Sequence, residues 1–203
     1  MRIDNNPINE VLIENPQYLP LTDPTNIRQW KMSAMFSDEF DGTEIDSNRW
    51  SNYHRFWAGR QPSVFDPKNV SVRDGSLLLT CTWEDEPTNL MIEANKTVQE
   101  GERIYENISA CAVQSIERTG YGYYELRART APISIASAFW FRDPIESKQE
   151  IDIFEQVGRP VNANRLNLNG SSYPMNTHWF KEGKGLNRSQ CYKLYNLNNL
   201  SLP

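Results

Sequence analysis

The sequence lacks both a long apolar run and a run of basic residues. A helix that crosses a membrane needs about 18 or more consecutive apolar residues, so no membrane span is predicted. The 203-residue chain has a formal net charge of -5, and a protein that binds nucleic acid by neutralising phosphates would need a broad basic surface. The polar, proline-rich start also lacks the pattern of a secretory signal peptide. Nucleic-acid and membrane partners are therefore not expected.

Cysteine is scarce, and the three cysteines, Cys81, Cys111 and Cys191, stand far apart without a C-x-x-C spacing. Neither a zinc site nor a dense disulfide framework is therefore predicted. Cys81 and Cys111 lie in apolar, strand-like runs with no histidine nearby in the sequence, which favours buried free thiols over catalysis. A disulfide stays open as an alternative.

Long runs of helix-favouring residues are also few. Short segments rich in aromatic and β-branched residues alternate with Gly, Pro, Asn and Asp, a pattern typical of strands joined by turns. The strand-like runs are Met35–Phe40, Val70–Val72, Ser76–Trp83, Ser109–Ile116, Tyr121–Arg129, Ser134–Phe141 and Glu150–Val157. At 38% hydrophobic residues the chain can bury one sizeable core. We predict an all-β sandwich.

Residues 1–30 are expected to form an extended lead-in to a single domain of residues 31–203. Four prolines, Pro7, Pro16, Pro20 and Pro24, interrupt regular helix and central-strand pairing in the lead-in.

The clearest alternation lies in Tyr121–Arg129. It places Glu125, Arg127 and Arg129 on one face and Tyr124, Leu126 and Ala128 on the other. The apolar face is expected to meet a partner sheet. The polar face is either exposed to solvent or part of a cleft floor.

The most informative segment is Gln149–Val157, which carries three carboxylates among β-favouring apolar residues. On a regular strand Glu150 and Asp152 share a face, but Glu155 would point inward, where an unpaired carboxylate is costly. A β-bulge near Ile153 or Phe154 would add one residue and return Glu155 to the face of Glu150.

With that bulge, the Glu150 and Glu155 Cα atoms would lie about 13 Å apart. Side chains leaning together would then approach the ~5–5.5 Å carboxyl separation of a retaining glycosidase, whereas an inverting enzyme needs a wider gap. Crowded charges raise at least one pKa, so an ionised Glu150 beside a protonated Glu155, tuned by Asp152, is expected. An acidic strand edge or a cation site is the alternative.

The E-I-D-I-F-E run of this strand resembles the E-x-D-x-x-E signature of glycoside hydrolase family 16. Three further segments match in the same order: Phe36–Gly42, Tyr121–Arg127 and Ala138–Trp140. The resemblance runs from about Trp30 to Phe180. It implies a concanavalin-like jelly-roll β-sandwich of two antiparallel sheets with a concave substrate cleft, and it implies retention of anomeric configuration.

By this resemblance Glu150 is the nucleophile, Asp152 the assisting carboxylate and Glu155 the acid/base. The W-x-G-R-x-P pattern of Trp57–Pro62 and the segment Met175–His178 are similar to segments of the red-algal galactanases, the β-agarases and β-porphyranases. The resemblance thus implies a secreted, periplasmic or cell-surface endo-β-galactanase, a monomer, that hydrolyses β-1,4 linkages of agar or porphyran.

Trp57 and Trp140 are candidates for stacking on galactose rings, and Arg60, Arg142 and His178 for polar contacts with the sugar or a sulfate. The alternatives stay open: Trp140 as a core aromatic residue, and Arg142 or His178 as surface residues.

The chemistry requires no cofactor and no catalytic metal. Relatives in the family carry a structural calcium, for which Asp38 or Asp41 could supply oxygens.

The family's strands continue beyond the position of Pro203, so C-terminal strands are expected to be missing from this sequence. Alternatives are a κ-carrageenase, a laminarinase, a carbohydrate-binding protein on the same scaffold, and an inactive shortened form.

Overall fold

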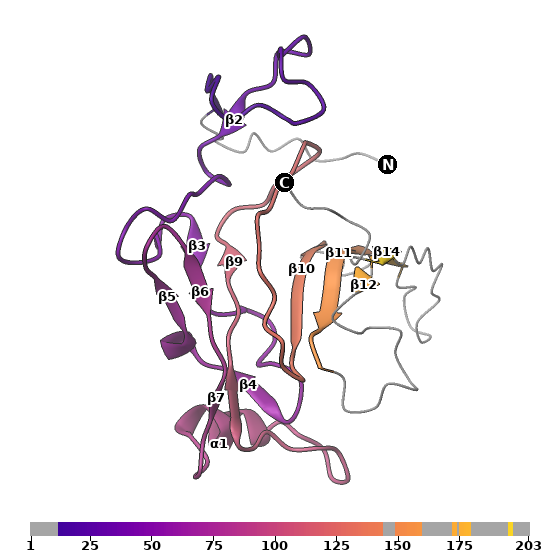
Figure 1. Cartoon of the computed structure of the whole chain (residues 1–203). Coiled ribbons are helices and arrows are strands. Elements are labelled where there is room, and N and C mark those ends of the chain that lie inside the picture. The colour runs from indigo at the N-terminus through magenta and orange to yellow at the C-terminus, as the bar shows by residue number, and fades with distance from the viewer. Residues whose placement is uncertain (1–11, 144–148, 160–171, 174, 180–194, 197–203) are drawn as a thin grey trace. The chain divides into compact units, whose positions relative to one another are not determined.

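The computed structural model describes residues 12–143, 149–159, 172–173, 175–179 and 195–196 (Figure 1). The chain divides into two compact units, Met1–Glu125 and Leu126–Pro203. Among the described residues, none of the helices has the length and apolar character needed to span a bilayer.

The described residues of the first unit form short strands, one 3₁₀ helix and one α-helix. They are β1 (Leu12–Ile13), β2 (Met32–Ser33), β3 (Trp50–Ser51), β4 (Ser63–Phe65), η1 (Pro67–Asn69), β5 (Val70–Val72), β6 (Leu77–Leu79), β7 (Thr82–Trp83), α1 (Asn89–Asn95), β8 (Ile108–Ala110) and β9 (Gln114–Ser115). Two-stranded pairs form between β1 and β2, β3 and β9, and β5 and β6. In the three-stranded sheet β4-β8-β7, β8 runs parallel to β4 and antiparallel to β7.

The second unit contains β10 (Ala136–Arg142), β11 (Gln149–Val157), β12 (Ser172–Tyr173), β13 (Asn176–Trp179) and β14 (Tyr195–Asn196). Its main sheet is antiparallel in the order β10-β11-β13, and β12 pairs with β14.

A small core lies where α1 packs against β4. Val64, Met91 and Tyr105 are buried there, with Ala94 and Val98 packed against them. The sequence analysis predicted no helix here. The local signal is Thr88, whose hydroxyl caps the helix by accepting from the Met91 N–H at 3.3 Å.

Asn69 is a buried polar hub of the first unit. Its Nδ2 donates to the Ser109 carbonyl at 2.8 Å and to the Ala110 carbonyl at 3.3 Å, while its Oδ1 accepts from the Thr82 hydroxyl at 2.9 Å. Because Thr82 lies in β7 and the two carbonyls lie in β8, one side chain ties both strands to the end of η1.

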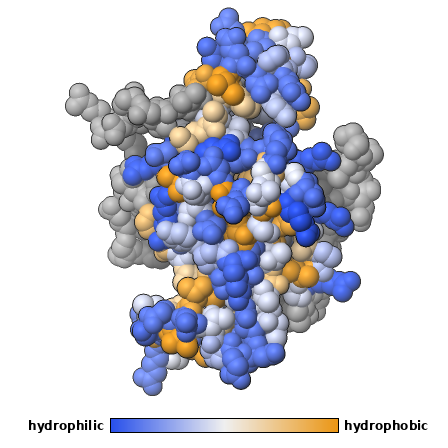
Figure 2. All heavy atoms as spheres, turned by 90° about the vertical axis from the view of Figure 1, so that its left-hand side faces the viewer, coloured by the Kyte–Doolittle hydropathy of each residue, from blue (hydrophilic) through white to orange (hydrophobic). Residues whose placement is uncertain are grey.

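The described residues are mostly in strands, turns and extended segments, which confirms the all-β prediction in its coarse form. The strands form small separate sheets, so the two-sheet sandwich is not resolved. Large apolar side chains lie exposed, among them Leu21 (80%), Ile27 (82%) and Trp83 (66%). Figure 2 shows apolar groups scattered between hydrophilic ones on the displayed face.

Some of the predicted strands are present at the expected positions, and others are divided into two. Val70–Val72 is confirmed as β5, and β10 and β11 lie within a residue or two of their predicted bounds. The runs Ser76–Trp83 and Ser109–Ile116 are each divided, into β6 and β7 and into β8 and β9.

Two strand predictions are wrong. Tyr121–Arg129 contains no strand and is exposed throughout, so its expected apolar face is not buried. Alternation alone does not make a strand, because a strand needs a pairing partner. Met35–Phe40 also contains no strand: Phe36 donates back to the Ser33 carbonyl at 3.4 Å, and the Asp38 carboxylate accepts from the Phe40 N–H at 2.9 Å. Such local bonds compete with strand pairing.

The prediction of buried thiols is also wrong for Cys81, which is exposed, while Cys111 is partly buried. Cys81 lies in the break between β6 and β7, where the predicted continuous strand is interrupted. Cys191 lies outside the described residues.

From the hydrogen bonds of the Asn69 hub, we predict that Asn69→Ala destabilises the first unit. Losing the amide leaves two β8 carbonyls and the Thr82 hydroxyl without this partner, at a cost of about 1–3 kcal/mol in the free energy of unfolding. The measurement is thermal unfolding together with amide hydrogen exchange in β7 and β8. The exposed Asn48→Ala is the control, expected to change stability by no more than about 0.5 kcal/mol. Equal effects of the two substitutions would contradict the role of the hub.

Candidate active site

The predicted bulge is present where β10 pairs with β11. The register pairs Phe139 with Phe154 but Trp140 with Asp152, so Ile153 is the extra residue opposite this step. Figure 1 shows the two strands side by side. The prediction of a bulge near Ile153 or Phe154 is confirmed.

The bulge brings the three carboxylates to one face of the sheet. Glu155, Asp152 and Glu150 pair in order with Ala138, Trp140 and Arg142. Because those three partners are alternate residues of β10, they share a face, and so do the residues opposite them. We call this side of β10-β11-β13 the carboxylate face.

Strand β13 adds a histidine and an asparagine to the carboxylate face, with His178 paired to Glu150 and Asn176 to Asp152. The His178 Nε2 lies 2.9 Å from Asp152 Oδ2 and 3.8 Å from Glu150 Oε1. On the other side, Arg142 Nη1 lies 3.8 Å from Glu150 Oε2. Glu150 is thus flanked by a guanidinium and an imidazole.

Asn176 was not among the predicted site residues. Its Nδ2 lies 2.7 Å from His178 Nε2. The available signal was its position two residues before His178, which places both on one face of a strand.

Asp152 is the buried centre of the cluster, with 3% of its surface exposed. The pKa of Asp152 is raised from its ordinary 3.8 to about 6, chiefly by burial and then by the negative charges of Glu155 and Glu150, while His178 acts in the opposite direction. The neighbouring carboxylates therefore contribute to a raised pKa at Asp152, in the direction that their crowding predicts.

Trp57 and Arg60 form a separate pair within the first unit. The Arg60 Cζ lies 6.0 Å from the centre of the Trp57 ring, within cation–π range, and both side chains are exposed. Between them, Gly59 has a φ of +126°, and a Cβ there would lie 2.5 Å from the Ser63 carbonyl oxygen. The Tyr105 hydroxyl donates to the Gly59 carbonyl at 3.0 Å. The loop therefore requires glycine to present this pair.

The structure thus gathers six of the eight predicted site residues, Glu150, Asp152, Glu155, Trp140, Arg142 and His178, on elements of the second unit. Trp140 is partly buried. Trp57 and Arg60 belong to the first unit, as a pair of their own.

Glu150, Asp152 and His178 each offer one atom within 4.8 Å of the others, a spacing that a divalent ion could bridge. The 2.9 Å contact between Asp152 and His178 already gives two of these three atoms a partner. Of the two aspartates that could supply oxygens to a structural calcium, Asp38 has its Oδ2 bound by the Trp50 indole N–H at 2.9 Å and by Arg49 at 3.0 Å. Asp38 is therefore a poor fit for a calcium ligand.

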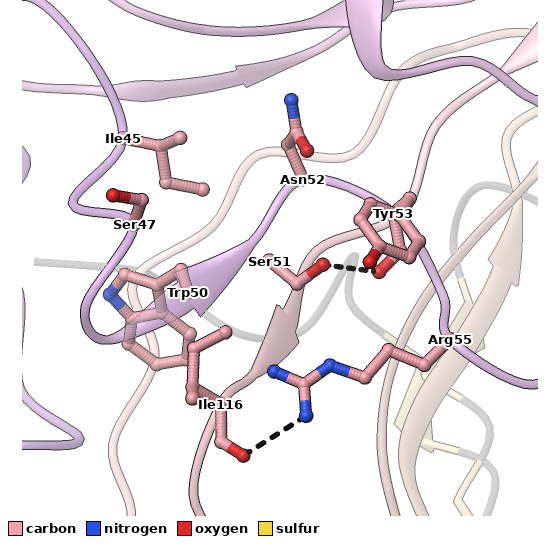
Figure 3. A pocket seen from close by; sticks show the side chains of 8 residues that line it. All are labelled: Ile45, Ser47, Trp50, Ser51, Asn52, Tyr53, Arg55 and Ile116. Atoms are coloured by element: carbon pink, nitrogen blue, oxygen red, sulfur yellow. Dashed lines mark hydrogen bonds between the residues drawn. The ribbon is translucent and has the colours of Figure 1, made fainter.

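A hollow of about 250 Å³ lies in the first unit beside β3 (Figure 3). The Ser51 hydroxyl donates to the Tyr53 carbonyl at 3.0 Å, and the Arg55 guanidinium donates to the Ile116 carbonyl at 3.4 Å along its wall. None of the predicted site residues lines the hollow, so it is not the candidate active site.

Comparison with known proteins points to one family. The family described as "Beta-porphyranase A-D, GH16 domain" matches residues 30–199. β-Porphyranase D of Zobellia galactanivorans is 32% identical over 172 residues, 78% of this chain and 38% of that protein. A β-agarase of Phocaeicola plebeius is 28% identical over 181 residues, 77% of this chain and 55% of that protein.

Among solved structures, porphyranase B of Zobellia galactanivorans aligns with a TM-score of 0.65 and 28% identity, covering 81% of this chain and 61% of the other. The chain spans about half the length of the curated relatives it matches.

The electrostatics predict the titration of Asp152. Its carboxyl carbon, followed by ¹³C NMR, should titrate near pH 6. Glu155→Gln should lower this pKa by removing a negative charge, and His178→Ala should raise it by removing the opposing imidazole. Because the folded-state pKa is raised, this carboxyl favours folding fully below about pH 4 and loses that contribution as the pH rises through about 6.

Unchanged titration in both variants would contradict this account of the cluster. Glu86→Gln, an exposed substitution in the first unit, is the control and should leave the midpoint of Asp152 in place.

Proposed function

The chain belongs to the glycoside hydrolase family 16 domain family of β-porphyranases A–D, and on that premise we propose that it is a retaining endo-β-galactanase acting on β-1,4 linkages of red-algal porphyran or agar. The observation that carries the proposal is the bulge at Ile153, which puts Glu150 and Glu155 on one face with Asp152 between them. A retaining glycosidase uses two carboxyl groups at opposite sides of one glycosidic bond.

In the proposed reaction Glu150 attacks the anomeric carbon of the galactose unit, while Glu155 gives its proton to the departing glycosidic oxygen. A covalent glycosyl ester on Glu150 results. Glu155, now a carboxylate, takes a proton from water, and the water oxygen attacks the anomeric carbon and displaces Glu150. Two inversions give net retention.

Asp152 and His178 are proposed to position the nucleophile and to set the charge beside it. The 2.9 Å contact between them fixes the imidazole 3.8 Å from Glu150, on the side opposite Arg142. Below about pH 6 a protonated Asp152 leaves less negative charge beside Glu150, and above it Asp152 adds charge to the cluster.

Porphyran is favoured over agar by the names of the matched family and of several relatives, and by the chemistry of the Trp57–Arg60 pair. An exposed indole can stack on the apolar face of a galactose ring. A guanidinium beside it presents paired N–H groups that suit a sulfate. Trp140 and Arg142 are proposed as further sugar contacts beside the carboxylates.

The other properties of the chain follow from the family as proposals. They are a jelly-roll sandwich with a concave cleft in residues 31–203, an extended lead-in in residues 1–30, a monomeric state, a secreted, periplasmic or cell-surface location, and no cofactor beyond a structural calcium. Asp41 remains the candidate among the two aspartates for such an ion.

The function is tested by incubating the purified chain with porphyran, agarose, κ-carrageenan and laminarin and measuring released oligosaccharides. Cleavage of porphyran or agarose is expected, and Glu150→Gln and Glu155→Gln should each lower kcat/KM by at least about 10³-fold. Glu86→Gln, which alters an exposed carboxylate of the first unit, should retain activity.

The competing functions give different outcomes in the same assay. Cleavage of κ-carrageenan or laminarin alone would replace the proposed substrate. Binding of porphyran that survives Glu150→Gln, without cleavage by the folded chain, would indicate a carbohydrate-binding protein. A folded chain that neither binds nor cleaves would be an inactive form.

Sulfate recognition is tested with Arg60→Ala on matched sulfated and neutral oligosaccharides. Loss of a charge-assisted contact should raise KM for the sulfated substrate by about 10-fold or more and leave the neutral one little changed. The exposed Arg73, paired with Asp74 at 3.4 Å, provides the control Arg73→Ala, which should change neither value. Equal losses on both substrates in Arg60→Ala would refute the sulfate role.

A further inference from the structure

Cys81 and Cys111 lie at the same end of the β7-β8 pair. The antiparallel register pairs Thr82 with Ser109. Cys81 directly precedes Thr82, and Cys111 directly follows the last residue of β8. Two cysteines separated by 29 residues in the sequence are therefore neighbours in the fold.

The backbone around both cysteines is held by the Asn69 hub. On one side of Cys81 the Thr80 N–H donates to the Asn69 carbonyl at 3.0 Å, and on the other side the Thr82 hydroxyl donates to Asn69 Oδ1 at 2.9 Å. Next to Cys111, the Ala110 carbonyl accepts from Asn69 Nδ2 at 3.3 Å and from the Asp66 N–H at 3.0 Å. One buried residue thus sets the positions of both thiols.

Hydrogen bonding by the neighbouring Cys111 thiol lowers the pKa of Cys81 to about 7, and the same interaction, together with burial, raises the pKa of Cys111. At neutral pH the pair therefore holds one readily formed thiolate, on the exposed cysteine, beside a protonated partner.

We propose that Cys81 and Cys111 are a redox-active pair that forms a reversible disulfide joining the β7 end to the β8 end. In the first step the Cys81 thiolate attacks a small-molecule disulfide such as oxidised glutathione, which gives a mixed disulfide and releases one glutathione thiolate. Cys111 then loses its proton, attacks Cys81 Sγ and displaces the second glutathione. The protein loses two protons and two electrons, and the oxidant is reduced to two thiols.

The Cys81–Cys111 disulfide would link two strands of the β4-β8-β7 sheet, which supports the Trp57–Arg60 loop. β8 pairs directly with β4, and the chain entering β4 is the segment that carries Arg60. The closed loop would also contain α1, whose Met91 lies in the core of the first unit. This inference concerns the first unit and stands independently of the proposed hydrolase activity.

The test equilibrates the reduced full chain in glutathione buffers of defined ratio at pH 7, blocks remaining thiols and maps peptides under non-reducing conditions. A Cys81–Cys111 peptide pair lacking two hydrogen atoms, restored to thiols by dithiothreitol, is expected. Its equilibrium constant of formation should exceed that of the urea-unfolded chain by about 100-fold or more, because the fold holds the thiols together. Cys191→Ser should give the same result.

Two single variants complete the design. In Cys111→Ser, Cys81 should keep a stable mixed disulfide with glutathione, because the resolving thiol is gone, and Cys81→Ser should react more slowly at its remaining Cys111. The proposal is overturned if both cysteines are recovered as blocked thiols from the folded chain in oxidising buffer. It is equally overturned if the bond found involves Cys191 or a second copy of the chain.

Discussion

The arrangement of the second unit depends on one extra residue in a strand. Ile153 occupies no place in the pairing of β10 with β11, and this shift lets Glu155 share a face with Glu150 and Asp152. Without the shift, Glu155 would point to the side of the sheet that carries Ile151 and Phe154. The bulge is therefore the physical condition on which the proposed two-carboxylate chemistry rests.

Gathering three acids on one face has an electrostatic cost, which is seen as a raised pKa at Asp152. This residue is buried between the other two. The surrounding groups relieve part of that cost, since His178 lies in hydrogen-bond contact with Asp152 and Arg142 lies near Glu150. Charge is thus distributed over three adjacent strands, and each strand supplies one kind of group: a guanidinium from β10, the acids from β11 and an imidazole from β13.

The first unit is held by a different kind of interaction, a buried amide that bonds to two strands. Asn69 connects β7 and β8 and also aligns the two cysteines, while the helix α1 supplies the apolar packing behind β4. The loop of Trp57 and Arg60 depends on this frame through Gly59, whose carbonyl accepts from Tyr105 in the same core. Several large apolar side chains of the described residues remain exposed in a chain that spans about half the length of its curated relatives.

The sequence by itself determined the mostly-β class, the carboxylate strand and the need for its bulge, because side-chain alternation with a period of two conflicts with the spacing of Glu150 and Glu155. It also determined the family, through motifs in a fixed order. Only tertiary structure decided that Tyr121–Arg129 forms no strand and that Asn176 contacts His178. Whether a segment pairs, and which distant side chains meet, depends on partners far along the chain, and local patterns carry no information about them.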